Sequence, residues 1–211
     1  MIIGAATRAA CLILAALALS SSLRVRAAQP GHTPAPVLYV AGLAALVCAF
    51  TLIVPRSAEA VETLSNRRRR RPAALLQGAA LVISPALLSR VYAVLMTGPH
   101  LRVGSSGTEE IRFGGVNLSP LIYIVAIPVV EELYFRGLLH REFRAIFGRP
   151  ALYILANAVW FASIHEGVSL PVAFVVGLFC ACLRTSTGGL LLPIVAHMLT
   201  NLTLDLPVDG T

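Results

Sequence analysis

Residues 128–136 read Pro-Val-Val-Glu-Glu-Leu-Tyr-Phe-Arg and place two adjacent acids, Glu131 and Glu132, inside an apolar run. Residues 121–130, which precede the acids, are almost continuously hydrophobic. A carboxylate near the centre of a bilayer costs roughly 2.5 kcal/mol or more, and chains retain one there when it faces a cavity or a partner. The stretch therefore predicts a buried polar site, and the alternative is a helix end with both acids in the headgroup layer.

The composition is that of a membrane protein. Of the 211 residues, 57% are hydrophobic and 13% are charged, whereas about 25% of the residues in a soluble domain are charged. Apolar runs of ~20 residues are what the hydrocarbon core of a bilayer demands. The net charge of +7 comes from arginines that lie mostly between apolar segments, where cytoplasmic loops collect positive charge. We therefore expect the chain to contact lipid and to have no nucleic-acid partner.

Seven apolar segments follow one another, separated by turn residues or charged loops. Each is expected to be a helix, and they cover residues 1–23, 37–54, 73–97, 116–147, 151–165, 170–183 and 190–204. The predicted fold is all-α, a polytopic transmembrane helix bundle with about seven spans. We divide it into an N-terminal region of three spans, residues 1–115, and a core of four helices, residues 116–205, which contains the conspicuous polar residues.

The placement of arginines predicts the orientation. Five consecutive arginines, Arg67–Arg71, follow the second segment, and putting their loop inside leaves more arginines in cytoplasmic loops than in outer ones. The N-terminus of this integral membrane protein is then cytoplasmic. The composition indicates that the membrane is a bacterial plasma membrane. The alternative for the first segment is a signal peptide, with its apolar region at Ala9–Ser20 and a cleavage site near Val25–Ala27.

Glu131 and His165 are predicted to meet at one depth. They lie 17 residues before and 17 residues after a turn centred near Gly148. In antiparallel helices that rise ~1.5 Å per residue, both side chains are then roughly 25 Å from the turn. A desolvated glutamate beside a histidine can hold a water molecule and act as its general base. The alternative for His165 is an interfacial residue at a helix end.

The two adjacent acids are expected to have different roles. Glu132 and Arg136 are spaced i, i+4 and share a helix face, so they can form an ion pair. Glu131 points about 100° away around the helix. We therefore predict that Glu132 is structural and that Glu131 is available for chemistry.

His197 and Asn201 are also spaced i, i+4, on an otherwise apolar helix. An imidazole and a carboxamide on one face can donate hydrogen bonds to a developing oxyanion. The alternative is that both side chains join neighbouring membrane helices by hydrogen bonds.

Zinc is the competing chemistry for the same residues. Glu131, His165 and His197 suffice as a three-ligand set, but the sequence contains no H-E-x-x-H motif. The cysteines lie inside apolar runs and offer no second pair with ligand spacing; they are Cys11, Cys48, Cys180 and Cys182. These patterns disfavour zinc and leave it as the alternative, and they indicate no other cofactor.

Three motifs in this order resemble those of the CPBP family of intramembrane proteases, which includes the CAAX prenyl endopeptidases and bacterial Abi-type proteins linked to bacteriocin immunity. They are Glu131-Glu132-x-x-x-Arg136, Phe161-x-x-x-His165 and His197-x-x-x-Asn201. The resemblance covers about residues 116–205. It implies a bundle of membrane helices around a cavity open to the cytosol, in which Glu131 and His165 activate water, His197 and Asn201 stabilise the oxyanion, and no metal takes part.

The resulting hypothesis is an intramembrane endopeptidase whose substrates are membrane-associated or lipidated peptides and proteins. Two other functions stay open. One is a non-catalytic membrane scaffold or bacteriocin-immunity protein that uses the pocket only for binding. The other is a transporter whose buried acid and histidines carry protons or metal ions, although the first half offers no matching membrane acid and no inverted repeat is detectable.

Overall fold

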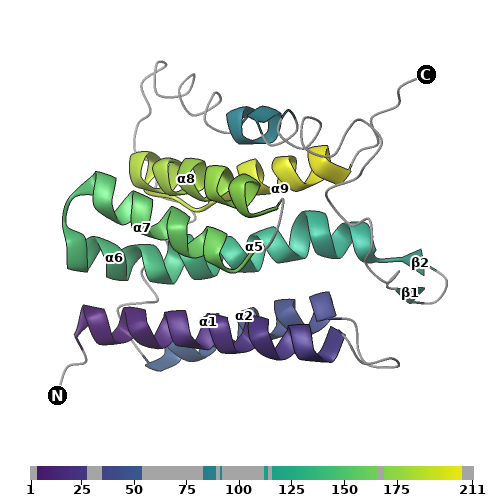
Figure 1. The fold of residues 1–211 in the computed structure, drawn as a ribbon, viewed down its shortest axis with the longest axis horizontal. Helices are drawn as coiled ribbons and strands as arrows, with labels where there is room; N and C mark the ends of the chain where they lie inside the picture. The colour runs from purple at the N-terminus through teal and green to yellow at the C-terminus, as the bar shows by residue number, and fades with distance from the viewer. Residues whose placement is uncertain are drawn as a thin grey trace.

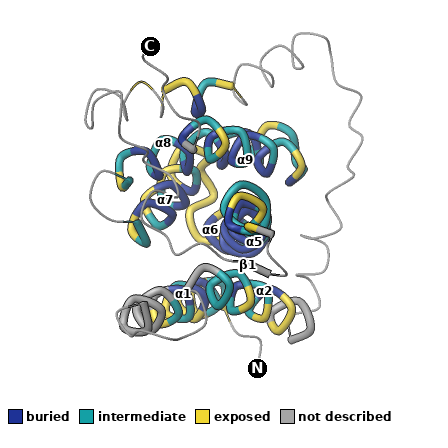
Figure 2. Tube along the Cα trace, turned by 90° about the vertical axis from the view of Figure 1, so that its right-hand side faces the viewer, coloured by how far each residue is buried: buried dark blue, intermediate teal, exposed yellow. Residues whose placement is uncertain are grey.

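The computed structural model describes residues 4–27, 35–53, 83–88, 91, 112–113, 116–165 and 169–205. Its long helices form three layers, and a short helical segment at residues 83–88 lies outside them (Figure 1). Helices α1 (Ala5–Ala27) and α2 (Ala35–Ile53) make one layer, a long central helix makes the second, and α7 (Pro150–Ser163), α8 (Ser169–Thr187) and α9 (Leu191–Asp205) make the third. Viewed end-on, the central helix lies between the other two layers (Figure 2). This position explains why nearly all residues from 130 to 140 are buried.

The central helix is uninterrupted from Ser119 to Phe147. Its segments are η3 (Leu121–Ala126), α5 (Ile127–Glu132), η4 (Leu133–Leu139) and α6 (His140–Phe147). The two η segments are π-helical, so their N–H groups donate to the carbonyl five residues earlier. This geometry is rare in proteins, and where it occurs it is often found at functional sites. They flank α5, which carries both glutamates of the opening motif.

The prediction that this helix begins at Val116 is wrong. Val116–Asn117 form the short strand β2, which pairs antiparallel with β1 (Arg112–Phe113) in a stretch predicted to be a loop. The Asn117 Oδ1 atom accepts a hydrogen bond from the Ser119 N–H at 3.0 Å. Such a cap satisfies one of the otherwise unpaired N–H groups at a helix start, so the helix begins after Asn117.

Two glycines at positive φ end helices where the sequence predicts breaks. Gly148, with φ of 67°, ends α6, and Pro150 then occupies the first turn of α7, as expected from the preference for glycine after a helix and proline at its start. Gly188, with φ of 70°, follows α8. Helix α8 ends at Thr187 and not at the predicted Leu183.

The all-α class is confirmed, and the number of spans is supported only in part. Among the described residues, α8 is the single helix that is long and apolar enough to cross a membrane; shorter apolar stretches occur in α1, α2, α7 and α9. Helices α7 and α9 have 14 and 15 residues; at ~1.5 Å per residue they are shorter than a hydrocarbon core of ~30 Å. Residues 67–71 and most of segment 73–97 lie outside the described residues, so the third span and the orientation stay predictions.

Apolar and polar contacts attach the N-terminal helix pair to the central helix. Leu12 of α1 and Leu43 of α2 are each 1% exposed. The Tyr134 hydroxyl donates to the Leu12 carbonyl. Nearer the end of the central helix, Glu142 Oε2 accepts hydrogen bonds from Arg8 Nε and Nη2 at 3.0 and 2.8 Å. The first layer is therefore docked along much of the central helix.

Candidate active site

A cavity of about 350 Å³ lies between α2, the central helix, the end of α7, α8 and α9. Most of its wall is apolar. The four residues predicted to carry the chemistry all line it: Glu131, His165, His197 and Asn201. They come from three separate parts of the chain, so the fold brings the three motifs to one place.

Glu131 is buried at one side of this cavity, with 3% exposure. Its Oε1 accepts a hydrogen bond from the Tyr39 hydroxyl at 2.7 Å. Its Oε2 lies 3.7 Å from His197 Nε2, which is longer than a direct hydrogen bond. Glu131 thus has one oxygen held by a donor and the other on the side of His197.

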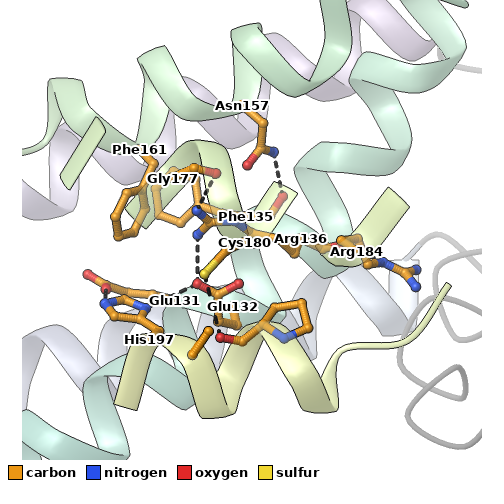
Figure 3. A network of polar contacts seen from close by, with 12 residues as sticks. Glu131, Glu132, Phe135, Arg136, Asn157, Phe161, Gly177, Cys180, Arg184 and His197 are labelled. Carbon is orange, nitrogen blue, oxygen red and sulfur yellow. Dashed lines mark hydrogen bonds and ion pairs between the residues drawn. The ribbon is translucent and has the colours of Figure 1, made fainter. Parts of the chain in front are cut away.

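The ion pair expected between Glu132 and Arg136 is present, and both side chains are fully buried (Figure 3). Arg136 Nη1 lies 2.8 Å from Glu132 Oε1, and Nη2 donates to the Gly177 carbonyl at 3.1 Å. The guanidinium carbon is 4.4 Å from the centroid of the Phe161 ring, within the range of a cation–π contact. Arg136 therefore joins the central helix to α7 and α8.

His197 lies between the two glutamates. Its Nδ1 is 3.0 Å from Glu132 Oε1, and since a carboxylate only accepts, Nδ1 carries a proton. Nε2 faces Glu131. His197 is therefore held by Glu132 through one ring nitrogen and turns the other toward Glu131.

His165 lies two residues beyond the end of α7, not within a helix as predicted. Its Nδ1 is 2.9 Å from the Phe161 carbonyl, and its N–H donates to the Ala162 carbonyl at 2.9 Å. Both bonds satisfy carbonyls that the end of the helix leaves without intrahelical partners. Because the carbonyl can only accept, Nδ1 is the protonated nitrogen and Nε2 is left for the cavity.

The Phe161 ring separates the two histidines. Its centroid is 4.9 Å from the ring of His165 and 5.4 Å from the ring of His197, the latter contact being edge-to-face. Phe161 is 1% exposed. Phe161, the first residue of the Phe161-x-x-x-His165 motif, thus packs against both imidazoles.

Asn201 lines the cavity and also joins two helices. Its Nδ2 donates to the Tyr123 carbonyl in η3 at 2.9 Å. This is the helix-joining contact that sequence analysis gave as the alternative. An amide has two N–H groups, so this bond still leaves one donor for chemistry.

Sequence reasoning missed several polar residues of this region, among them Tyr39, Tyr123 and Asn157. Tyr39 and Tyr123 line the cavity, and Asn157, which is fully buried, donates to the Phe135 carbonyl at 2.8 Å. A buried amide in the apolar segment 151–165 is a signal that could have identified Asn157. Nothing in the sequence around Tyr39 indicates that its hydroxyl meets a carboxylate 92 positions away.

Among the described residues, no group of three or more histidine, cysteine, aspartate or glutamate side chains is arranged to hold a metal ion. The candidate zinc set of Glu131, His165 and His197 is therefore not assembled as a metal site in this part of the chain. Glu131 interacts instead with a tyrosine, and His165 with a backbone carbonyl.

The fold and this site define an all-helical protein with a buried glutamate–histidine centre. Residues 114–203 match the sequence profile of the Rce1-like type II CAAX prenyl endopeptidases. The match agrees with the resemblance carried by the three motifs.

One curated relative is an Escherichia coli protein named "Uncharacterized 24.3 kDa protein". It is 33% identical over 88 residues, which cover 39% of this chain and 41% of that protein. The chain thus matches about two fifths of the length of this relative. No solved structure matches the chain.

Proposed function

We propose that this protein is an intramembrane endopeptidase that hydrolyses peptide bonds of membrane-associated or lipidated substrates with a glutamate-activated water. The observation that carries the proposal is the common cavity of Glu131, His165, His197 and Asn201. Transfer of an acyl group to water is catalysed by a general base and by hydrogen-bond donors to the oxyanion. Here Glu131 is the base, His165 is the imidazole beside it, and His197 and Asn201 are the donors.

Glu131 is the general base. The oxygen of a water molecule attacks the scissile carbonyl carbon while one of its protons passes to the Glu131 carboxylate. The same proton then goes to the leaving amine nitrogen as the C–N bond breaks, which leaves a carboxylic acid and a free amine. His165, with Nε2 toward the cavity, orients the water.

His197 and Asn201 stabilise the oxyanion. His197 is held by Glu132 through Nδ1 and turns Nε2 toward the cavity. An N–H at that nitrogen donates to the substrate oxygen as negative charge develops there. Because Glu132 and Arg136 fix the imidazole before substrate arrives, this donor needs no reorganisation during the reaction.

The cavity favours an extended apolar peptide segment. Its volume of about 350 Å³ is near the lower end of ligand pockets, roughly 300–1,000 Å³, and accommodates only a few side chains at a time. Apolar walls formed by residues such as Ile127, Val172 and Leu204 suit a hydrophobic anchor or a lipidated tail. We place the reaction in a bacterial plasma membrane, with several of the helices as spans.

The test is cleavage of lipidated and plain hydrophobic peptides by the purified full-length chain. We expect Glu131→Gln to lower kcat by about 10²–10⁴-fold, the usual contribution of a general base, while its thermal unfolding stays close to that of wild type. Glu142→Gln is the matched control, because Glu142 lies on the same helix, is 1% exposed and is outside the cavity. It should retain wild-type kcat, with a lower thermal unfolding midpoint because the ion pair with Arg8 is lost.

Two arms of the same experiment separate the alternatives. Activity that a strong chelator removes and zinc restores reassigns Glu131, His165 and His197 as metal ligands. Folded wild-type protein that binds the peptides without cleaving them supports the scaffold function. Equal rates for Glu131→Gln and wild type rule out the glutamate mechanism.

A further inference from the structure

One polar group reaches the cavity from outside the family domain. The Tyr39 hydroxyl of α2 donates to Glu131 Oε1 at 2.7 Å, and Tyr39 lines the same cavity. O–H···O⁻ bonds of about 2.5–2.7 Å are charge-assisted and roughly twice as strong as neutral ones. Residue 39 lies well before the matched region, 114–203, so no motif of the family includes it.

Packing fixes where this hydroxyl lies. Tyr39, Leu43 and Val47 are spaced i, i+4, i+8 and form one stripe of α2. Leu43 and Val47 are 1% and 8% exposed, and all three belong to or pack against the core cluster shared with the central helix. The register of α2 is therefore set by apolar burial, and Tyr39 cannot leave Glu131 without disturbing that interface.

The two oxygens of Glu131 are consequently not equivalent. Oε1 is occupied by Tyr39, and Oε2 lies on the side of His197 Nε2. The last torsion of a glutamate side chain is broad and roughly two-fold, so without an anchor either oxygen can turn toward the cavity. A carboxylate held at one oxygen keeps the other in place for proton transfer, and such orientation supplies part of the rate enhancement.

We propose that Tyr39 is a positioning residue for Glu131, which holds Oε1 and thereby makes Oε2 the oxygen that accepts the proton of the attacking water. This inference rests on the proposed function. It makes α2 a part of the active site, so that residues 114–203 alone do not complete the site.

Tyr39→Phe in the full-length protein tests the inference, because it removes the hydroxyl and keeps the ring. We expect kcat to fall by about 10- to 100-fold, the range for loss of one hydrogen bond to a charged group. KM should change by no more than about twofold, since the ring still lines the cavity.

Tyr134→Phe is the matched control. It also removes a phenol that joins the N-terminal helices to the central helix, but that phenol donates to the Leu12 carbonyl and lies outside the cavity. We expect wild-type kcat with a lower thermal unfolding midpoint. An equal fall in kcat for both variants means that Tyr39 acts only by docking the helices, and this outcome overturns the inference.

A second readout does not depend on proteolysis. An apolar carbodiimide labels buried carboxyl groups, and mass spectrometry measures the labelling rate at Glu131. Because the phenol covers Oε1, we expect labelling several-fold faster in Tyr39→Phe and unchanged in Tyr134→Phe. If wild type cleaves nothing but labelling responds to Tyr39→Phe alone, the proposed function fails and the positioning contact stands. If wild type cleaves peptides and Tyr39→Phe matches it in kcat and labelling, the inference fails and the proposed function stands.

Discussion

At the scale of single residues, the two adjacent glutamates are both buried but differ in what they contact. Glu132 is fully buried and paired with Arg136 and His197, whereas Glu131 lines the cavity. The step of about 100° between neighbouring helical residues produces this difference. A buried ion pair in such a place is not a source of stability in itself. In this site Glu132 holds the His197 imidazole and the Arg136 guanidinium in fixed positions.

Loss of one partner of this pair should be costly. We expect Arg136→Gln to lower the free energy of unfolding by roughly 3–5 kcal/mol. The substitution removes the cationic partner of the buried Glu132 carboxylate and leaves it with His197 alone. It also removes the hydrogen bond to the Gly177 carbonyl. Denaturant unfolding in detergent measures the change. Arg144→Gln, an exposed arginine of the same helix, is the control and should stay within about 0.5 kcal/mol. Similar small changes in both variants would contradict the buried network.

At the scale of elements, the site depends on the close approach of α7 and α8. A Cβ placed on Gly177 would lie 3.0 Å from Ala158 Cα and 3.2 Å from its carbonyl oxygen. Only glycine permits this distance, because the opposing atoms belong to the backbone and cannot turn away. The same glycine offers its carbonyl to Arg136, so the helix contact and the polar network share one position.

Gly177→Ala should therefore destabilise the protein although alanine favours helices. We expect a loss of roughly 1–3 kcal/mol from overpacking against backbone, measured by thermal unfolding. Gly137→Ala is the matched helical control, since its added Cβ would make only ordinary van der Waals contacts, with the Leu190 side chain at 3.6 Å and the Glu132 carbonyl oxygen at 3.9 Å. That variant should be neutral or more stable by up to about 1 kcal/mol. The same sign for both substitutions would argue against a tight contact at Gly177.

At the scale of the whole molecule, the central helix carries contacts on both sides. The third layer supplies the histidines and Asn201, and the first layer supplies Tyr39 (Figure 1). Within the described residues, polar contacts attach the first layer to the central helix at Glu131, Tyr134 and Glu142. Contacts to the cavity thus come from a layer that lies outside the matched residues, 114–203.

The ion pair at the far end of this layer should control its local opening. The Arg8 side chain is 21% exposed and the Glu142 side chain is 1% exposed. Solvent therefore partly screens the contribution of this ion pair to stability. We expect Arg8→Gln to lower the free energy of local opening of α1 by about 1 kcal/mol. Amide hydrogen exchange in residues 9–16 should then be several-fold faster. Arg149→Gln, an exposed arginine in the turn before α7, should leave that exchange unchanged; equal acceleration would contradict docking through Arg8.

Much of the helical framework followed from local sequence. Apolar runs and the Gly148 and Pro150 signals predicted α1, α2, the central helix and the three helices after it, because chain breaks have local chemical causes. Boundaries were less accurate where a side-chain bond decided them. Asn117 starts the central helix late, and α7 stops before His165 because that residue bonds back to the helix end.

By itself the sequence determined which side chains are chemically able to form the site. Polar groups inside apolar runs are costly to bury, so they are retained mainly where they face a cavity or a partner. The tertiary structure decided their partners. It placed His197 between both glutamates, gave one N–H of Asn201 to the Tyr123 carbonyl and brought Tyr39 to Glu131. The physical reason is that periodicity within a helix fixes which face a residue occupies. Which residue of another helix meets that face depends on packing, which no local pattern records.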